Sequence, residues 1–308
     1  MKKINAILPI LVAATLIVSC DKIEGPTREV VTAGVVIGEN AILIDGDTIQ
    51  FTEDTSTPVQ RVMVEDYTGH LCGNCPPAGV MLNDSMRALF GDRLVAVSVH
   101  SGQFADVCPT ALDCPSAAPV GAFTADYRST VGDIWAAKFL VNANPIGLID
   151  RVGYPTAHKK TYLNWKTAAQ NELANSPTAK LNISLKYDET TRKIKAGVKT
   201  EMIQSYNDYL KVQMIIVEDS IVDWQQWYGH TPQLVPDYLF HDILRASMNG
   251  NFGDSLSVTI PMNAGVKFIN GYFTTLASGW NPDKCKVVAF VFDANTYRII
   301  QVEEKKIK

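Results

Sequence analysis

The chain has 308 residues, which is long enough for two domains. Hydrophobic residues make up 46% of it and charged residues 19%, a balance that suits a globular protein and excludes a disordered one. The net charge of −4 at pH 7 gives no indication of a nucleic-acid partner, so we expect none.

The first twenty residues are typical of an export signal. Two lysines, Lys2 and Lys3, precede an apolar run, Ile7–Val18, which is too short to span a bilayer comfortably. The segment Ile17–Cys20 (IVSC) then resembles a bacterial lipobox, with isoleucine where the usual pattern has leucine, and predicts lipidation of Cys20. The alternatives are an uncleaved apolar anchor and a plain secretory signal. In each case we expect an extracytoplasmic protein, in a compartment where disulfides persist.

Residues 21–60 are expected to form a polar tether followed by a short β-meander. The tether contains a Gly-Pro pair, and the β-branched runs between Val30 and Phe51 are broken by Gly-Glu-Asn and Asp-Gly-Asp. Such tripeptides are turn signals between short strands.

The segment Arg61–Pro77 (RVMVEDYTGHLCGNCPP) carries the clearest chemical signal. An apolar run, Val62–Val64, predicts a strand, and the residues after the second cysteine continue with helical spacing. Two cysteines, Cys72 and Cys75, lie at the strand-to-helix turn, a pattern typical of a redox pair. The free N–H groups of a helix N-terminus favour a thiolate at Cys72, and Cys75 is close enough to close a small disulfide ring.

The remaining pattern changes character once along the chain. Strand and helix alternate over residues 61–176, which predicts an α/β layer structure. From residue 177 to residue 308 the apolar period is two, and about seven short strands with regular turns predict a β-sandwich. A long connection, Trp224–Asn251, interrupts these strands and is either functional or has its own structure.

The other cysteines have simpler interpretations. Cys108 and Cys114 are close enough in sequence to bridge a loop, and a structural disulfide is favoured over a second redox pair. The odd cysteine, Cys285, lies beside an apolar run and is expected to be a buried strand thiol.

The order of elements from residue 61 to 176 resembles that of a thioredoxin fold. Asp66 lies six residues before Cys72, where thioredoxins carry a buried acid, and Pro145 stands where they place a cis-proline beside the disulfide, here preceded by Asn144. The sequence departs from the thioredoxin pattern at Leu71, where thioredoxins have tryptophan, and its Gly-Asn inner pair lacks the usual proline.

The resemblance implies a role for each of these residues. Cys72 is the nucleophile that forms a mixed disulfide with the substrate, and Cys75 resolves it. Asp66 takes the proton from Cys75, and Pro145 holds the substrate backbone beside the sulfurs. His70, if protonated, favours the Cys72 thiolate, and Asn144 is expected to tune the site as the residue before the proline.

Two other interpretations of the cysteine pair are open. The first is an inert disulfide, although so small a ring removes little chain entropy. The second is a metal site that adds His70 or His100 to the pair, which the lack of a second Cys-x-x-Cys weakens. We expect neither a metal nor another cofactor.

The chain also resembles the outer-membrane-protein-28-related lipoproteins of Bacteroidetes-type bacteria. The resemblance rests on the lipobox, on the block Glu65–Pro76 (EDYTGHLCGNCP) and on the β-rich C-terminal half, with a weaker echo at His241–Arg245. It implies a lipid-anchored outer-membrane protein, periplasmic or surface facing. It also implies a thioredoxin-like domain followed by an immunoglobulin-like domain, and no firmly assigned substrate.

These observations lead to two expectations of function. The first is a thiol–disulfide oxidoreductase that uses Cys72 and Cys75 on protein thiols or disulfides of the cell envelope. The second is a non-catalytic binding or structural lipoprotein that uses the thioredoxin-like fold as a scaffold, because a fold alone does not establish a function.

Overall fold

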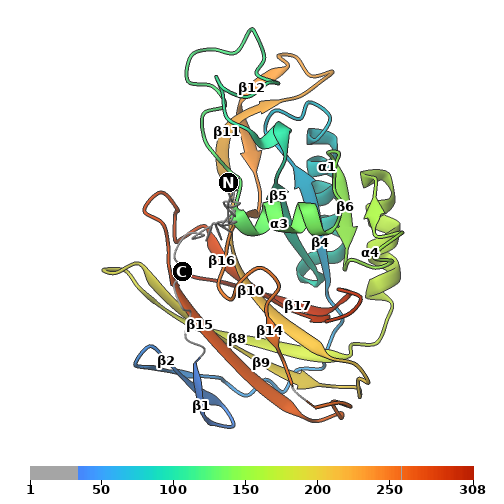
Figure 1. Ribbon diagram of the computed structural model, residues 1–308, viewed down its shortest axis with the longest axis vertical. Coiled ribbons are helices and arrows are strands. Elements are labelled where there is room, and N and C mark those ends of the chain that lie inside the picture. The colour runs from blue at the N-terminus through green and yellow to red at the C-terminus, as the bar shows by residue number, and fades with distance from the viewer. Residues whose placement is uncertain (1–33, 258) are drawn as a thin grey trace, which may run out of the picture. The chain divides into compact units, whose positions relative to one another are not determined.

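The computed structural model describes residues 34–257 and 259–308, and strands dominate its architecture (Figure 1). The predicted signal peptide, the lipidation site Cys20 and the predicted tether lie outside the described residues. None of the helices in the described part of the chain has the length and apolar character that a membrane crossing requires.

A three-stranded antiparallel meander comes first. It consists of β1 (Val35–Gly38), β2 (Ala41–Ile44) and β3 (Asp47–Gln50). The turn Asp45-Gly46 between β2 and β3 has positive φ at both residues, which the Asp-Gly sequence tolerates. Apolar side chains of the meander pack against Ile269 and Phe273 of a second sheet.

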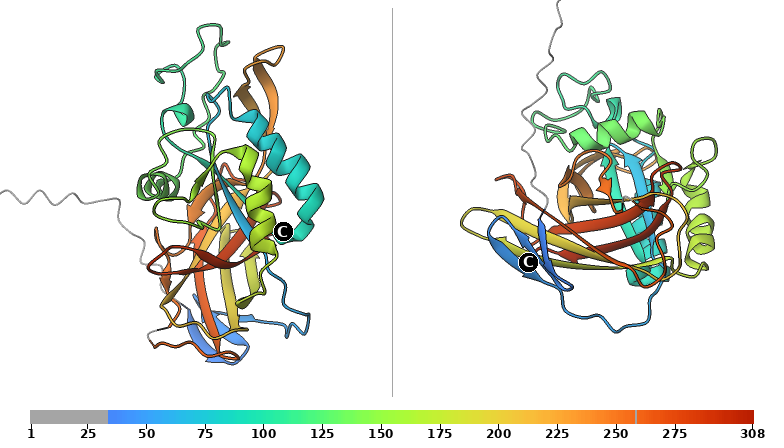
Figure 2. Two further views of the ribbon diagram at one scale, coloured as in Figure 1. Left: turned by 90° about the vertical axis from the view of Figure 1, so that its right-hand side faces the viewer. Right: turned by 60° about the horizontal axis from the view of Figure 1, so that its bottom comes forward.

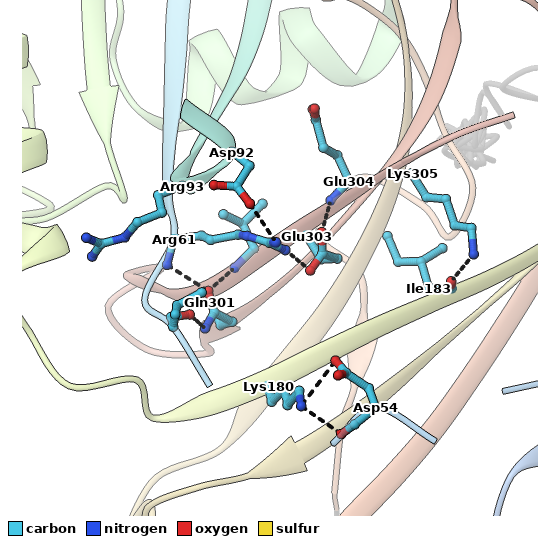
Figure 3. A network of polar contacts seen from close by, with 12 residues as sticks. Asp54, Arg61, Asp92, Arg93, Lys180, Ile183, Gln301, Glu303, Glu304 and Lys305 are labelled. Atoms are coloured by element: carbon cyan, nitrogen blue, oxygen red, sulfur yellow. Dashed lines mark hydrogen bonds and ion pairs between the residues drawn. The ribbon is translucent and has the colours of Figure 1, made fainter. Parts of the chain in front are cut away.

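The linker after the meander is held by polar contacts, which Figure 3 shows. The Lys180 ammonium donates to the Asp54 carbonyl at 2.8 Å, and the backbone N–H of Arg61 donates to Gln301 Oε1 at 3.1 Å. The Arg61 guanidinium pairs with Glu303. The linker therefore fastens the start of the next strand to residues near the C-terminus.

The largest sheet combines strands from both halves of the chain. Its order is β17-β16-β10-β13-β5-β4-β6-β7, with β14 paired to β10. The strands from the first half are β4 (Val62–Thr68), β5 (Leu94–His100), β6 (Ile146–Ile149) and β7 (Lys159–Lys160). Those from the second half are β10 (Leu210–Glu218), β13 (Ile243–Ser247), β14 (Asp254–Ser255), β16 (Cys285–Asp293) and β17 (Ile299–Lys306).

The predicted fold class, an α/β thioredoxin-like domain followed by an immunoglobulin-like sandwich, is wrong. Strand β13 pairs in parallel with β5 and antiparallel with β10, so the two halves share one sheet. The Ser98 N–H donates to the Asp242 carbonyl at 2.8 Å at this junction. The protein is instead mostly β-structure in several sheets, with helices added to one part of the largest sheet.

Helices cover both faces of β4 and β5, which explains why every residue of both strands is buried, including Glu65 and Asp66. On one face lie α1 (Pro76–Val80), a π-helical turn (Met81–Met86), α2 (Arg87–Phe90) and α4 (Trp165–Leu173). On the other face lies α3 (Thr130–Lys138). The left view of Figure 2 shows α4 beside the helix that begins with α1.

A second sheet covers the other end of the largest one. It consists of β8 (Ala179–Asp188), β9 (Lys193–Met202) and β15 (Lys267–Thr275). Strand β16 is buried on both faces: Val287, Ala289 and Val291 face the second sheet, whereas its alternate residues join the α3 core. The remaining described strands, β11 (Ile221–Gln226) and β12 (Leu234–Phe240), form a hairpin of their own.

A buried ion pair lies in the core that the two halves share. The Arg151 guanidinium donates to both Glu65 oxygens at 2.8 Å, and both side chains are at most 1% exposed. The guanidinium lies 4.7 Å from the Trp135 ring centre and 5.3 Å from that of Phe290, a strand residue of the second half. The pair therefore links β4 and the residues after β6 to β16.

Candidate functional site: the Cys72–Cys75 loop

Cys72 and Cys75 form a disulfide in the turn that follows β4, with 5.4 Å between their Cα atoms. Helix α1 begins at Pro76, and Cys75 is its N-cap. Proline is favoured in the first helical turn, where the backbone N–H groups have no helical partner. The helix follows the second cysteine as the sequence predicted, but the residue at its N-terminus is Cys75 instead of Cys72.

Both cysteines are 3% exposed, so the disulfide lies below the surface. Cys75 lines a cavity of about 20 Å³ together with Asp66 and His100. This volume has room for one water molecule. Asp66, Thr68, Ser98 and His100 reach it because alternate residues of neighbouring strands point to the same face.

Asp66 is the acid that the sequence placed before the cysteine pair. It is 4% exposed, and its Oδ1 has no hydrogen-bond partner within the described residues. Burial raises the pKa of Asp66 from 3.8 to about 7, because a charged carboxylate is poorly solvated there. Asp66 is therefore poised to exchange a proton near neutral pH.

His70 and His100 are both buried and adopt different environments. His70 Nε2 lies 2.8 Å from the Asp106 carbonyl, and burial lowers the pKa of this histidine. That burial disfavours the imidazolium on which a tuning role for His70 depends. His100 packs against Tyr127, and burial lowers its pKa well below the usual value. Neither histidine belongs to a metal-binding cluster of described residues.

The peptide bond between Asn144 and Pro145 is cis. The Asn144 amide donates to the Thr68 carbonyl at 3.1 Å, at the end of β4. Asn144 therefore ties the proline loop to the strand that leads into the cysteine motif.

The second predicted disulfide, Cys108–Cys114, also forms, with 5.7 Å between its Cα atoms. Both disulfides thus agree with the predicted pairs. The bridged loop packs on the cysteine motif through a small apolar cluster that contains Leu71, Cys108, Phe123, Trp224 and Leu234. Among the described cysteines Cys285 is the free one, and burial raises its pKa to about 12.

The hairpin β11–β12 covers the cysteine motif, and sequence reasoning missed this. Gln225 Nε2 donates to the Cys72 carbonyl at 3.1 Å, and Gln225 is 2% exposed. The backbone N–H of Tyr228 donates to the Gly73 carbonyl at 2.8 Å. The only sequence signal was the long connection Trp224–Asn251, whose first part is rich in aromatic residues. Figure 1 shows the hairpin at the top, beside the bridged loop.

These features define a class of protein: a mostly β-structured protein with two disulfides among its described residues, one of them a Cys-x-x-Cys pair at a strand-to-helix turn. Persistent disulfides are typical of proteins outside the cytoplasm. The family model described as outer membrane protein Omp28 matches residues 133–308, which is more than half of the chain. The protein therefore belongs to the Omp28 family of outer membrane proteins and is a cell-envelope protein.

Solved structures give a further comparison. HBP35 of Porphyromonas gingivalis matches with a TM-score of 0.55 and 13% identity, over 82% of this chain and 76% of that chain. At this identity the likeness shows the fold alone. A domain of the outer membrane lipoprotein Omp28 from Porphyromonas gingivalis matches with a TM-score of 0.29 and 21% identity, over 44% of this chain and 91% of that chain. A search of curated proteins finds no match.

The family match confirms the expected membership of the Omp28 family and the expected envelope location. The part that matches the family begins at residue 133, after the cysteine motif. It includes His241–Arg245, the weaker echo, which overlaps the strand β13 that joins the two halves. The roles predicted for the site residues stay predictions.

Proposed function

We propose that this lipoprotein is a thiol–disulfide oxidoreductase that uses Cys72 and Cys75 on disulfides of exported proteins. The observation that carries the proposal is the shared cavity, in which Asp66, with a pKa of about 7, lies beside Cys75. A carboxyl group whose pKa is near the ambient pH is well suited to accept and return a proton. The lipid expected on Cys20 holds the protein at the membrane.

The proposed reaction assigns a step to each residue. The Cys72 thiolate attacks one sulfur of the partner disulfide, and the other partner sulfur leaves as a thiolate. Cys75 gives its proton to Asp66 and then displaces the partner from Cys72, which re-forms the Cys72–Cys75 disulfide. Asn144 holds the proline loop to the end of β4, the strand that leads into the pair, and Pro145 is assigned the role of holding the partner backbone.

The reduction potential of the Cys72–Cys75 pair tests the proposal. We expect a value between about −120 and −270 mV, the span of working oxidoreductases. The measurement is alkylation and peptide mass spectrometry across glutathione and dithiothreitol buffers, with the Cys108–Cys114 peptide as an internal control. A value below about −300 mV marks a structural disulfide and rejects the proposal.

A second candidate function has one observation in its favour. Both cysteines are 3% exposed, which suits a non-catalytic binding or structural lipoprotein whose disulfide only stabilises the loop. Under that function, the double variant Cys72→Ser/Cys75→Ser retains its envelope partners in pull-downs. Under the oxidoreductase proposal, Cys75→Ser accumulates mixed disulfides with exported proteins, and Cys72→Ser does not.

A further inference from the structure

The carbonyl groups of the cysteine loop are already occupied by the β11–β12 hairpin. The backbone N–H of Gln226 donates to the His70 carbonyl at 2.9 Å, and that of Tyr228 donates to the Gly73 carbonyl at 2.8 Å. Between them, the Gln225 side chain donates to the Cys72 carbonyl. Three donors from residues 225–228 thus pair with the loop that holds the nucleophile.

The Tyr228 ring lies directly on Gly73. A methyl group built on Gly73 would be 2.6 Å from three atoms of this ring, which is far inside van der Waals contact. Glycine at this position therefore permits the close approach of the ring. Tyr228 is itself 52% exposed, so one side of the ring covers the loop and the other faces outward.

The spacing of the two backbone donors is that of an extended polypeptide. Residues 226 and 228 are two apart, as are the groups on one edge of a strand, and peptide ligands commonly bind through such backbone donors. We propose that the hairpin occupies the surface on which a disulfide-bearing polypeptide docks, and that the partner displaces it to reach Cys72. This inference rests on the proposed function, because it names the substrate class and the control of the same site.

The contacts of the hairpin allow its tip to move away from the cysteine loop while its base stays packed on the rest of the protein. Its two strands pair only with each other among the described strands, and an isolated hairpin is marginally stable. The base is anchored, since Phe240 and Ile221 pack with Tyr127 and Ile243. The tip contacts the cysteine loop through Tyr228 and the hydrogen bonds above, while Trp224 and Leu234 share the small apolar cluster with Leu71.

The rate at which the Cys72–Cys75 disulfide is reduced tests whether the hairpin covers it; this contact is called the cover below. The Cys72–Cys75 disulfide of the full chain in detergent is reduced by a protein dithiol, reduced thioredoxin, and in parallel by dithiothreitol. We expect Tyr228→Ala to speed reduction by thioredoxin about tenfold, because the rate follows the open fraction, and to speed the reaction with dithiothreitol less. The control is Tyr209→Ala, which removes a tyrosine of similar exposure, 45%, remote from the motif. Unchanged rates in Tyr228→Ala overturn the cover.

Gly73→Ala disrupts the same contact from the cysteine loop and leaves the sequence of the hairpin unchanged. The added methyl group displaces the ring, so we expect faster reduction by thioredoxin here as well. In the double variant Gly73→Ala/Tyr228→Ala the ring is absent, so reduction should be no faster than in the faster single variant. Additive accelerations would mean that the two residues act separately and would reject the contact as the cause.

The polypeptide class is tested with reduced Cys75→Ser, alone and combined with Tyr228→Ala. Insulin serves as the polypeptide disulfide and glutathione disulfide as the small one. We expect the combined variant to gain several-fold in mixed disulfide with insulin and little with glutathione. Equal gains with both probes would reject a polypeptide-binding surface under the hairpin.

The reduction potential, measured on the same samples, separates this inference from the proposed function. A potential in the structural range, with faster reduction in Tyr228→Ala, retains the cover and rejects the oxidoreductase. A potential in the working range, with unchanged rates in both variants, retains the oxidoreductase and rejects the cover.

Discussion

Asp66 shows how burial converts an ordinary carboxyl into a group that titrates near neutrality. In the unfolded chain its pKa is close to the usual 3.8, whereas in the folded protein burial raises it to about 7. Between these values the folded protein keeps a proton that the unfolded chain has lost. The free energy of unfolding therefore falls as the pH rises from about 4 to about 7.

Asp66→Asn should remove this pH dependence. The variant keeps a neutral amide in the cavity, so we expect it to be more stable than the wild type at pH 8, by at most about 4 kcal/mol, and similar at pH 4. Urea unfolding at pH 4, 6 and 8 measures the difference, with the exposed Asp84→Asn as the control. Parallel stability curves for Asp66→Asn and the wild type would contradict the raised pKa of Asp66.

The same substitution should slow the exchange reaction if Asp66 is the base for Cys75. We expect re-formation of the Cys72–Cys75 disulfide to lose its dependence on a group with a pKa near 7. Comparing the pH profile of Asp66→Asn with that of Asp84→Asn distinguishes a lost proton acceptor from a general change in stability.

At the level of elements, the loop closed by Cys108–Cys114 packs against both the cysteine motif and the β11–β12 hairpin. Its apolar residues pack with Leu71, which precedes Cys72, and with Trp224 of β11. The disulfide spans only six positions, so its entropic contribution to stability is about 2 kcal/mol. Its effect should be mainly local.

The double variant Cys108→Ala/Cys114→Ala should loosen this loop and leave the sheets intact. We expect faster amide hydrogen exchange over residues 105–124 and near Leu71, because the closed loop no longer restricts their opening. Exchange in β16, which is buried throughout, should not change. Equal acceleration in β16, or none in the loop, would contradict a local supporting role.

Local sequence patterns predicted where the cysteine motif lies in the fold, but they did not predict which segments pack around it. The spacing of Cys72 and Cys75 after an apolar strand sufficed to place them at a strand-to-helix turn, whereas Asp66 was singled out only through the resemblance to thioredoxins, which carry a buried acid six residues before the first cysteine. The hairpin contact could not be predicted, because Gln225 and Cys72 are 153 residues apart and no local pattern encodes their pairing. Strand β13 was missed because its five residues lie inside a long connection and do not alternate.

At the level of the whole molecule, the short strand β13 determines the architecture. With β13 between β5 and β10, strands from both halves become one sheet, and the described residues form one compact unit. The periodicities of the two halves still differ, which is why the sequence indicated separate folds. Periodicity reports which side of a strand is buried and does not report which strand lies beside it.

The described part of the protein should therefore unfold as one unit. We expect a single calorimetric transition with similar calorimetric and van't Hoff enthalpies. Arg151→Met should lower the entire transition, because it leaves the buried Glu65 carboxylate unpaired between the halves. Two separate transitions, or an effect of Arg151→Met on only one of them, would show that the halves are independent.

The position of the hairpin in the sequence also determines whether the Cys72–Cys75 disulfide can form before the hairpin covers it. A chain made and exported from its N-terminus presents Cys72 and Cys75 to the oxidising compartment before Gln225, which follows 153 residues later. At about 5–20 residues per second, that interval is on the order of ten seconds or more. The newly arrived cysteines are thus accessible to the oxidation machinery while the segment that will cover them is still being made, and the disulfide can form before it is enclosed.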